Sequence, residues 1–126
     1  MDRTNWSGTL GEGVENVIGN IFDGNTGSDI AANSAPWEFT LDLGAETTML
    51  GANTRHWGSG YPPRSIEVLT SPDNATWKSH GTLAVSGGTQ NWRFLKPVTA
   101  RYLRYRVMSP NGRTDVTEFN IYVAKQ

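Results

Sequence analysis

The chain has 126 residues, of which 18% are charged and 37% hydrophobic, and its formal net charge at pH 7 is −1. This length suits one domain that buries about two-thirds of the surface its unfolded form would expose. The composition excludes a disordered or fibrous chain, because the 14 glycines and 6 prolines follow no period. We therefore expect one turn-rich globular domain over residues 1–126. Met1 stands directly before a polar segment, so we expect this domain to be a module of a larger protein.

The charges are unevenly distributed along the chain. Residues 1–50 contain eight acidic residues and one basic residue, whereas residues 93–126 contain seven basic and two acidic residues. The basic residues alternate with apolar ones in a strand-like pattern and do not gather in a lysine-rich run, so we expect no nucleic-acid partner. We expect the basic face of these strands to be solvated and the opposite charges of the two regions to complement each other within the fold.

Several chemistries are excluded by what the sequence lacks. The chain has no cysteine, so it can form no disulfide, zinc knuckle or thiol nucleophile. No apolar stretch approaches the roughly 20 residues of a membrane helix, and no secretory signal pattern opens the chain. We therefore expect no membrane insertion.

The first half of the chain holds one weak helical pattern and one strong strand pattern. Residues 14–22 are the only segment with a helix-like sequence pattern, and Gly19 lowers the helix propensity of this segment. Residues 37–43 alternate between apolar and polar side chains, which is the period of a half-buried strand, and we expect Gly44 to end that strand. Its apolar face consists of Trp37, Phe39, Leu41 and Leu43.

A hairpin is predicted in the middle of the chain. Residues 64–71 place Ile66 and Val68 on one side of a strand, and Pro72–Asn74 form a turn. A second strand at about residues 76–83 returns beside the first.

Two more strand patterns complete the chain. The first alternates Leu103, Tyr105 and Val107 with basic or polar residues. The Asn111-Gly112 pair then predicts a turn, and a closing strand over residues 118–123 has an apolar face of Phe119, Ile121 and Val123. Many short strands without long helices between them favour an antiparallel sandwich or barrel over a parallel α/β sheet.

Six short segments, in order, resemble the signatures of F5/8 type C (discoidin-like) domains, whose bacterial branch is the family 32 carbohydrate-binding modules. The resemblance spans residues 5–124, and the absence of cysteine is similar to the bacterial modules. It implies an all-β fold, an eight-stranded antiparallel jelly-roll β-sandwich. The segments are Phe22–Asn25, Phe39–Gly44, Pro63–Val68, Thr70–Trp77, Ala100–Arg104 and Glu118–Tyr122.

The same resemblance implies a structural calcium ion. Calcium prefers six to eight hard oxygen ligands, including carboxylates. Taken alone, Asp23-Gly24-Asn25 is more typical of an Asx turn, but the family pairs this turn with a glutamate near the C-terminus. The sequence departs from the family in having Ser28 and Ile30 where a threonine and a tryptophan are usual. The implied ligands are Asp23, Glu118, Asn25, Ser28 and the carbonyl of Asn20.

A sugar site is expected in the loop at residues 55–63. Sugars present an apolar CH face and a rim of hydroxyls, so their sites need an exposed aromatic plane with polar groups beside it. Arg55 and His56 are candidates to bind hydroxyls, and Trp57 or Tyr61 to stack on the ring. Candidates on neighbouring loops are Asn91, Arg93, Asn111 and Arg113, with Trp92 as a second exposed tryptophan. We expect Trp37 and Trp77 in the core, Trp6 at one end of the sandwich and His80 at the surface.

The resemblance implies a non-catalytic module that recognises terminal galactose or N-acetylhexosamine on glycans. Such modules target an attached glycoside hydrolase, such as a hexosaminidase or chitobiase, sialidase or galactosidase, in a secreted, periplasmic or cell-surface protein. Catalysis by this domain is not expected, because both histidines are isolated and no nucleophile elbow or phosphate-binding loop is present. A spacer domain with a degenerate site and a protein- or lipid-binding discoidin domain remain as alternatives.

Overall fold

The structure is a computed structural model that describes residues 3–24, 29–55, 64–84, 89–109 and 113–123. Within residues 89–109 it describes the side chains of residue 94 and of residues 96–109. No helix in these ranges is long and apolar enough to cross a membrane.

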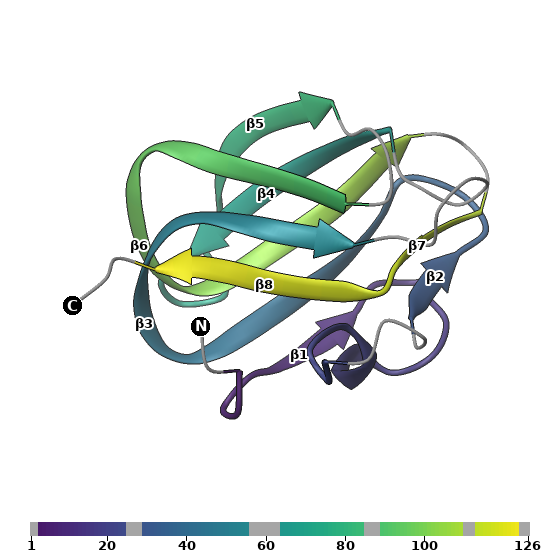
Figure 1. Cartoon of the computed structure of the whole chain (residues 1–126), viewed down its shortest axis with the longest axis horizontal. Helices are drawn as coiled ribbons and strands as arrows, with labels where there is room; N and C mark the ends of the chain where they lie inside the picture. The colour runs from purple at the N-terminus through teal and green to yellow at the C-terminus, as the bar shows by residue number, and fades with distance from the viewer. Residues whose placement is uncertain (1–2, 25–28, 56–63, 85–88, 110–112, 124–126) are drawn as a thin grey trace.

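Two antiparallel sheets make up the fold (Figure 1). The larger sheet has the order β1-β3-β6-β4-β5, with β8 also paired to β3, and β2 pairs with β7 in the smaller sheet. All strand pairings in the described ranges are antiparallel, which confirms the all-β sandwich. The strands are β1 (Ser7–Leu10), β2 (Ile30–Ala32), β3 (Trp37–Arg55), β4 (Ser65–Ser71), β5 (Lys78–Ala84), β6 (Thr89–Ser109), β7 (Thr114–Val116) and β8 (Glu118–Val123).

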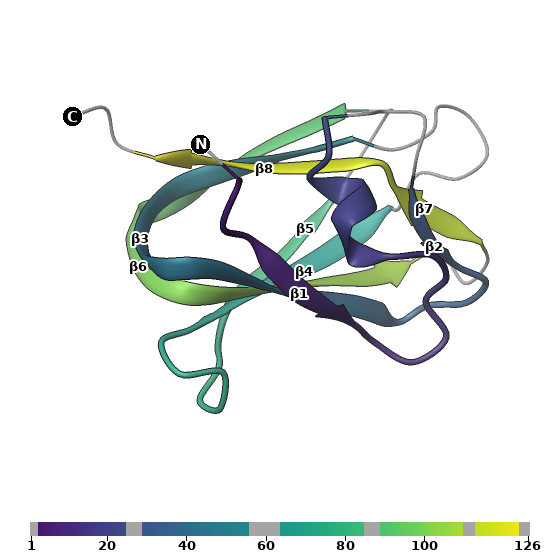
Figure 2. The same ribbon diagram turned by 90° about the horizontal axis from the view of Figure 1, so that it is seen from below.

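The two long strands, β3 and β6, bend and so belong to both layers of the sandwich. The first half of β3 pairs with β1 and with the second half of β6. After a register shift between Asp42 and Thr47, β3 pairs with the first half of β6 and, from Met49 onward, with β8; a second shift lies between Met49 and Gly51. Figure 2 shows both strands curving from the layer that contains β1 to the layer that contains β8.

Gly44 bends β3 and does not end it, so the predicted strand boundary was wrong. Its φ of 84° lies in the left-handed region that favours glycine, and its N–H donates to Asp42 Oδ1 at 2.8 Å. A Cβ at this position would lie 2.9 Å from the carbonyl oxygen of Asn5. A glycine can therefore turn the chain here while the strand continues to Arg55.

Three aromatic rings join the two layers in the core. Phe39 of β3 stacks on Tyr105 of β6 with a centroid distance of 5.2 Å, and both meet the edge of Phe119 from β8 at 5.7 and 5.6 Å. All three side chains are fully buried. Edge-to-face and offset-stacked pairs of this kind add to the free energy gained from burial alone.

The predicted apolar faces are largely confirmed. The apolar faces predicted for residues 37–43, 64–71 and 103–107 are buried, and so are Phe119 and Ile121. Val123 is the exception, because it follows the register shift at the end of β8 and remains 39% exposed. Residues 14–22 contain only a short 3-10 helix, η1 (Ile18–Ile21).

Three arginines in the second half of β6 form ion pairs across the strands. Arg101 contacts Asp42 at 2.8 Å, and this hydrogen bond lowers the pKa of the Asp42 carboxyl. Arg104 and Arg106 both contact Glu38, at 2.8 and 3.1 Å, and Arg106 also reaches Glu67 of β4. The expected internal complementarity is therefore present, and the expected solvated basic face is present in part, since the side chains of Arg101, Arg104 and Arg106 remain 43%, 24% and 31% exposed.

Phe119→Ala tests the role of the aromatic cluster. It removes the ring that joins the two layers, so we expect it to lower the free energy of unfolding by about 3–5 kcal/mol. Tyr122→Ala, on the exposed face of the same strand, is the matched control and should change it by less than about 0.5 kcal/mol. Denaturant titration measures both values, and equal midpoints for the two variants would contradict this role.

Candidate functional site

The predicted sugar loop begins and ends at one end of the sandwich. Arg55, the last residue of β3, lies between Thr89 of β6 and Glu118 of β8. Arg64 at the other end of the loop donates its N–H to the Ser109 carbonyl at 2.7 Å. Figure 1 shows both ends of β6 on the same side of the molecule as the end of β3. The side chain of Arg55 is exposed there.

Four of the predicted sugar-binding residues lie outside the described residues: His56, Trp57, Tyr61 and Asn111. They remain predictions.

Three further candidates belong to a strand. Asn91, Trp92 and Arg93 were expected on or beside a loop, but they lie within β6. Their backbones pair with Asn53, Ala52 and Gly51 of β3, respectively. The placement as loop residues was wrong because β6 extends back to Thr89 in order to pair with the second half of β3.

Arg113, the last sugar-site candidate, already has partners. Its guanidinium donates to the carboxylate of Glu15 and, at 2.8 Å, to the side-chain oxygen of Asn33. These contacts tie the start of β7 to the segments before and after β2. The side chain is still 40% exposed, so it remains accessible to a ligand.

Glu118 lies at the centre of the predicted metal site. Its Oε1 accepts the N–H of Gly24 at 2.9 Å, which brings the carboxylate to the loop that contains Asp23. Its Oε2 pairs with the guanidinium of Arg3, which also donates to the Phe119 carbonyl at 3.1 Å. The carboxylate is mostly buried, with 12% of the side chain exposed.

A second set of polar contacts orders the segment before this loop. Asn20 lies in η1, and its side-chain amide donates to the Asp29 carbonyl at 2.9 Å. Asn16 donates to Asp29 Oδ1 at 3.0 Å. Asp23 is exposed, whereas Asp29 is buried. The chain on both sides of residues 25–28 is therefore held by hydrogen bonds.

Part of the predicted ligand set comes together, while both oxygens of Glu118 already accept hydrogen bonds, from Gly24 and from Arg3. Glu118 and the loop with Asp23 meet, as predicted, and carboxylate and amide oxygens are the ligands that calcium prefers. Asn25 and Ser28 lie outside the described residues. In the described part of the chain no group of three or more acidic or histidine side chains gathers. Neutral oxygens would therefore have to complete the coordination.

The pairing of Arg3 with Glu118 was not predicted. The two residues are 115 positions apart in the sequence. The strand pairings that bring them together cannot be recognised from any local sequence pattern. A lone basic residue in an acidic region was the one available signal.

The predictions for the tryptophans and His80 had mixed outcomes. Trp37 and Trp6 are buried as predicted, and Trp6 packs against Phe22 at 5.9 Å. Trp77 is only half-buried, so its assignment to the core was wrong. It precedes the edge strand β5, which has β4 as its only described neighbour in the sheet. His80 is half-buried and hydrogen-bonded to Thr70.

Comparison with known proteins identifies a family. Residues 4–120 match the family model described as F5/8 type C domain. No curated protein sequence matches the chain.

Solved structures share the fold at low sequence identity. The C-terminal domain of a chitobiase from Bacteroides fragilis superimposes with a TM-score of 0.85 at 18% identity, covering 98% of this chain and 97% of that one. The family 32 module of NanJ from Clostridium perfringens, solved with galactose, gives 0.76 at 16% identity, with 92% and 90% covered. The family 32 module of AlyQ, solved with 4,5-unsaturated mannuronic acid, gives 0.79 at 22% identity, with 98% and 97% covered.

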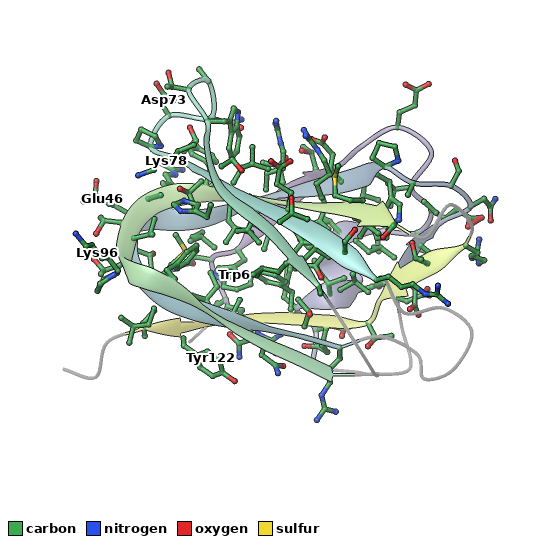
Figure 3. All side chains as sticks on the ribbon, turned by 90° about the horizontal axis from the view of Figure 1, so that it is seen from above. Trp6, Glu46, Asp73, Lys78, Lys96 and Tyr122 are labelled. Carbon is green, nitrogen blue, oxygen red and sulfur yellow. The ribbon has the colours of Figure 1, made fainter. Side chains whose placement is uncertain are left out.

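Glu118→Gln tests the ion pair with Arg3. Glutamine keeps an oxygen for the Gly24 N–H but loses the charge that pairs with the guanidinium. In a chelator, we expect the free energy of unfolding to fall by about 1–3 kcal/mol. Glu46→Gln, at an exposed position on the bend of β3 (Figure 3), is the control and should have little effect. Equal denaturation midpoints for the two variants would show that the ion pair contributes nothing.

Proposed function

Because the chain belongs to the F5/8 type C domain family, we propose that it is a non-catalytic carbohydrate-binding module. The observation that carries the proposal is that both ends of the predicted sugar loop lie beside the end of β3. Arg55 and Arg64, the described residues on either side of the predicted sugar loop, are both fixed to the sandwich at one end. A rigid base for a loop with aromatic and hydrogen-bonding side chains is what recognition of a sugar requires.

We propose terminal galactose or N-acetylhexosamine as the ligand. Two modules with the same fold are described in complex with galactose and with GalNAc-β-1,3-galactose. In this chain, Trp57 or Tyr61 would stack on the CH face of the ring, and Arg55 and His56 would bind hydroxyls. Asn91, Trp92, Arg93, Asn111 and Arg113 are the further candidates around this site.

The proposed role is to concentrate an attached enzyme on its substrate. A single exposed site of this kind binds weakly, on the order of millimolar, but linkage to a glycoside hydrolase raises the local concentration of enzyme at the glycan. The neighbour from a chitobiase is consistent with such an attachment. We propose a secreted, periplasmic or cell-surface location for the parent protein, where polymeric glycans are found.

We further propose that one calcium ion braces the end of the sandwich beside the sugar loop. Asp23, Asn25, Ser28, Glu118 and the carbonyl of Asn20 would hold it. The ion would fix the loop by neutralising its carboxylates and would take no part in chemistry. Arg3 would compete with the calcium ion for Glu118, because its guanidinium already pairs with this carboxylate.

Trp57→Ala tests the sugar site. It removes the proposed stacking platform, so we expect binding to methyl β-galactoside or N-acetylgalactosamine to disappear while the melting temperature changes by less than about 2 °C. Saturation-transfer NMR measures binding, and Tyr122→Ala, which removes an exposed aromatic ring on β8, is the matched control.

Two results would contradict this site. One is wild-type sugar binding by both Trp57→Ala and Tyr61→Ala, and the other is loss of the folded spectrum of Trp57→Ala, which would place Trp57 in the core. Sedimentation of the wild-type domain with anionic vesicles, together with no response to any sugar, would favour a lipid-binding discoidin domain instead.

Calcium titration of Arg3→Ala tests the metal site. Removing the competing guanidinium should tighten calcium binding severalfold relative to wild type, and calcium should raise the melting temperature of both proteins. Arg113→Ala loses the same charge away from Glu118 and is the control, with wild-type affinity expected. No calorimetric heat and no thermal shift in either wild type or Arg3→Ala would exclude the site.

A further inference from the structure

The strand β8 forms a free edge of its layer. In the described part of the chain its one strand neighbour is β3, with which it pairs from Glu118 to Val123. Figure 1 shows β8 at the margin of the layer, with β3 beside it. A free edge presents N–H and C=O groups that can pair with a strand of another molecule. Such an edge favours association between molecules unless something blocks it.

Alternate residues of β8 direct their backbone groups away from β3. In an antiparallel pair, residues that bond the partner strand alternate with residues whose N–H and C=O groups point outward. The Phe119 carbonyl accepts a hydrogen bond from the guanidinium of Arg3 at 3.1 Å. Two residues on, the N–H of Ile121 donates to Asn120 Oδ1 at 2.8 Å. Both backbone groups are bonded to side chains, so Phe119 and Ile121 are the residues that face the free edge.

Arg3 covers this edge at Phe119 and is anchored there. Its guanidinium also pairs with one carboxylate oxygen of Glu118, and the other oxygen accepts the N–H of Gly24 at 2.9 Å. Hydrogen bonds between charged groups are stronger than those between neutral groups. The side chain of Arg3 is only 19% exposed. A strand that approached Phe119 would therefore have to displace an arginine with several partners.

Asn120 covers the same edge at Ile121. It is half-buried, and its backbone pairs with Asn53 of β3. Its amide oxygen takes the N–H that would otherwise donate to a carbonyl of an incoming strand. Asparagine side chains compete with strand pairing in this way because they bond nearby backbone groups. Valine at this position would suit a strand equally well but could accept no hydrogen bond.

The side chains of β8 would otherwise favour pairing. Tyr122 and Val123 are 47% and 39% exposed, and aromatic and β-branched residues are typical of strands. The strand contains no lysine or proline, the residues that commonly keep free edges from pairing. Two copies of one strand can pair antiparallel about a two-fold axis, because each contributes the same residues. A second copy of this chain is therefore the partner that this edge fits.

The edge strand β5 is protected by other means. Its register against β4 shifts in the stretch that contains Gly81, whose φ is 95°. Lys78 at the start of β5 is exposed. Irregular register and an exposed lysine both disfavour pairing with another strand. In β8 the register shift lies only at the last pair, at Val123, so its protection depends on the two side chains that cover it.

We propose that Arg3 and Asn120 cap the free edge of β8 and thereby keep two copies of this chain from pairing strand to strand. Without these two caps, two copies pair antiparallel along β8. Glu118 at the start of β8 pairs with Arg55, so a second copy would lie beside the base of the proposed sugar loop. The caps keep that end of the sandwich accessible. The proposal does not depend on sugar binding.

The test removes the caps in a chelator, so that no metal replaces Arg3. Asn120→Val removes one cap and keeps the Arg3 pair. A triple variant adds Arg3→Met and Glu118→Gln, which removes both caps without leaving an unpaired carboxylate. Light scattering after size exclusion should give 13.8 kDa for wild type and a rise toward twice that mass for the triple variant at about 0.2 mM protein, with a smaller rise for Asn120→Val. Thr82→Val, the same change of side chain at an exposed position on β5, is the matched control and should stay monomeric.

Hydrogen exchange locates the contact between the copies. In the triple variant, exchange at the Phe119, Ile121 and Val123 amides should slow about tenfold or more as the protein concentration rises. A folded triple variant that stays monomeric would overturn the proposal, and so would a wild-type dimer paired along β8 or a dimer protected at other strands. If near-UV circular dichroism shows that the triple variant does not fold, Asn120→Val decides, and a monomer at every concentration would overturn the proposal.

Discussion

The bend that takes β3 and β6 from one layer to the other is the constraint on which the rest of the structure depends. Each strand pairs with the other along both halves, so neither layer can form without the other. Gly44 allows the turn because a side chain there would meet the Asn5 backbone. The rings of Phe39, Tyr105 and Phe119 then fill the space between the layers.

The candidate site at the end of β3 follows from this bend. At one end of the sandwich it returns β3 to Arg55, where Thr89 and Glu118 flank it, and this fixes the base of the proposed sugar loop beside the proposed metal loop. At the other end, the bend of β6 and the hairpin of β4 and β5 together line a hollow. One backbone feature therefore shapes both ends of the sandwich.

The strand faces could be predicted from sequence because alternation is a local property. Trp37, Phe39, Leu103 and Tyr105 are buried as the period of two indicates. The continuation of β3 past Gly44 could not be predicted, because a glycine in a turn conformation ends many strands and only the pairing beyond it shows that the strand resumes.

The contacts between distant parts of the chain were also beyond sequence reasoning. The pair between Arg3 and Glu118 needs β8 beside the loop that follows η1, and the stacking of Arg104 on Trp77 needs the edge position of β5. The family resemblance did predict that Glu118 and the loop at Asp23 would meet, because it carries long-range information that composition and periodicity lack.

The most direct test of sugar recognition at the end of β3 is an amide chemical-shift map with galactose and N-acetylgalactosamine, in the presence of calcium. We expect saturable shifts concentrated at Thr54, Arg55, Arg64 and Glu118, which are described residues at the base of the proposed loop. Sugar recognition there would be contradicted if neither sugar shifted these amides at concentrations well above millimolar.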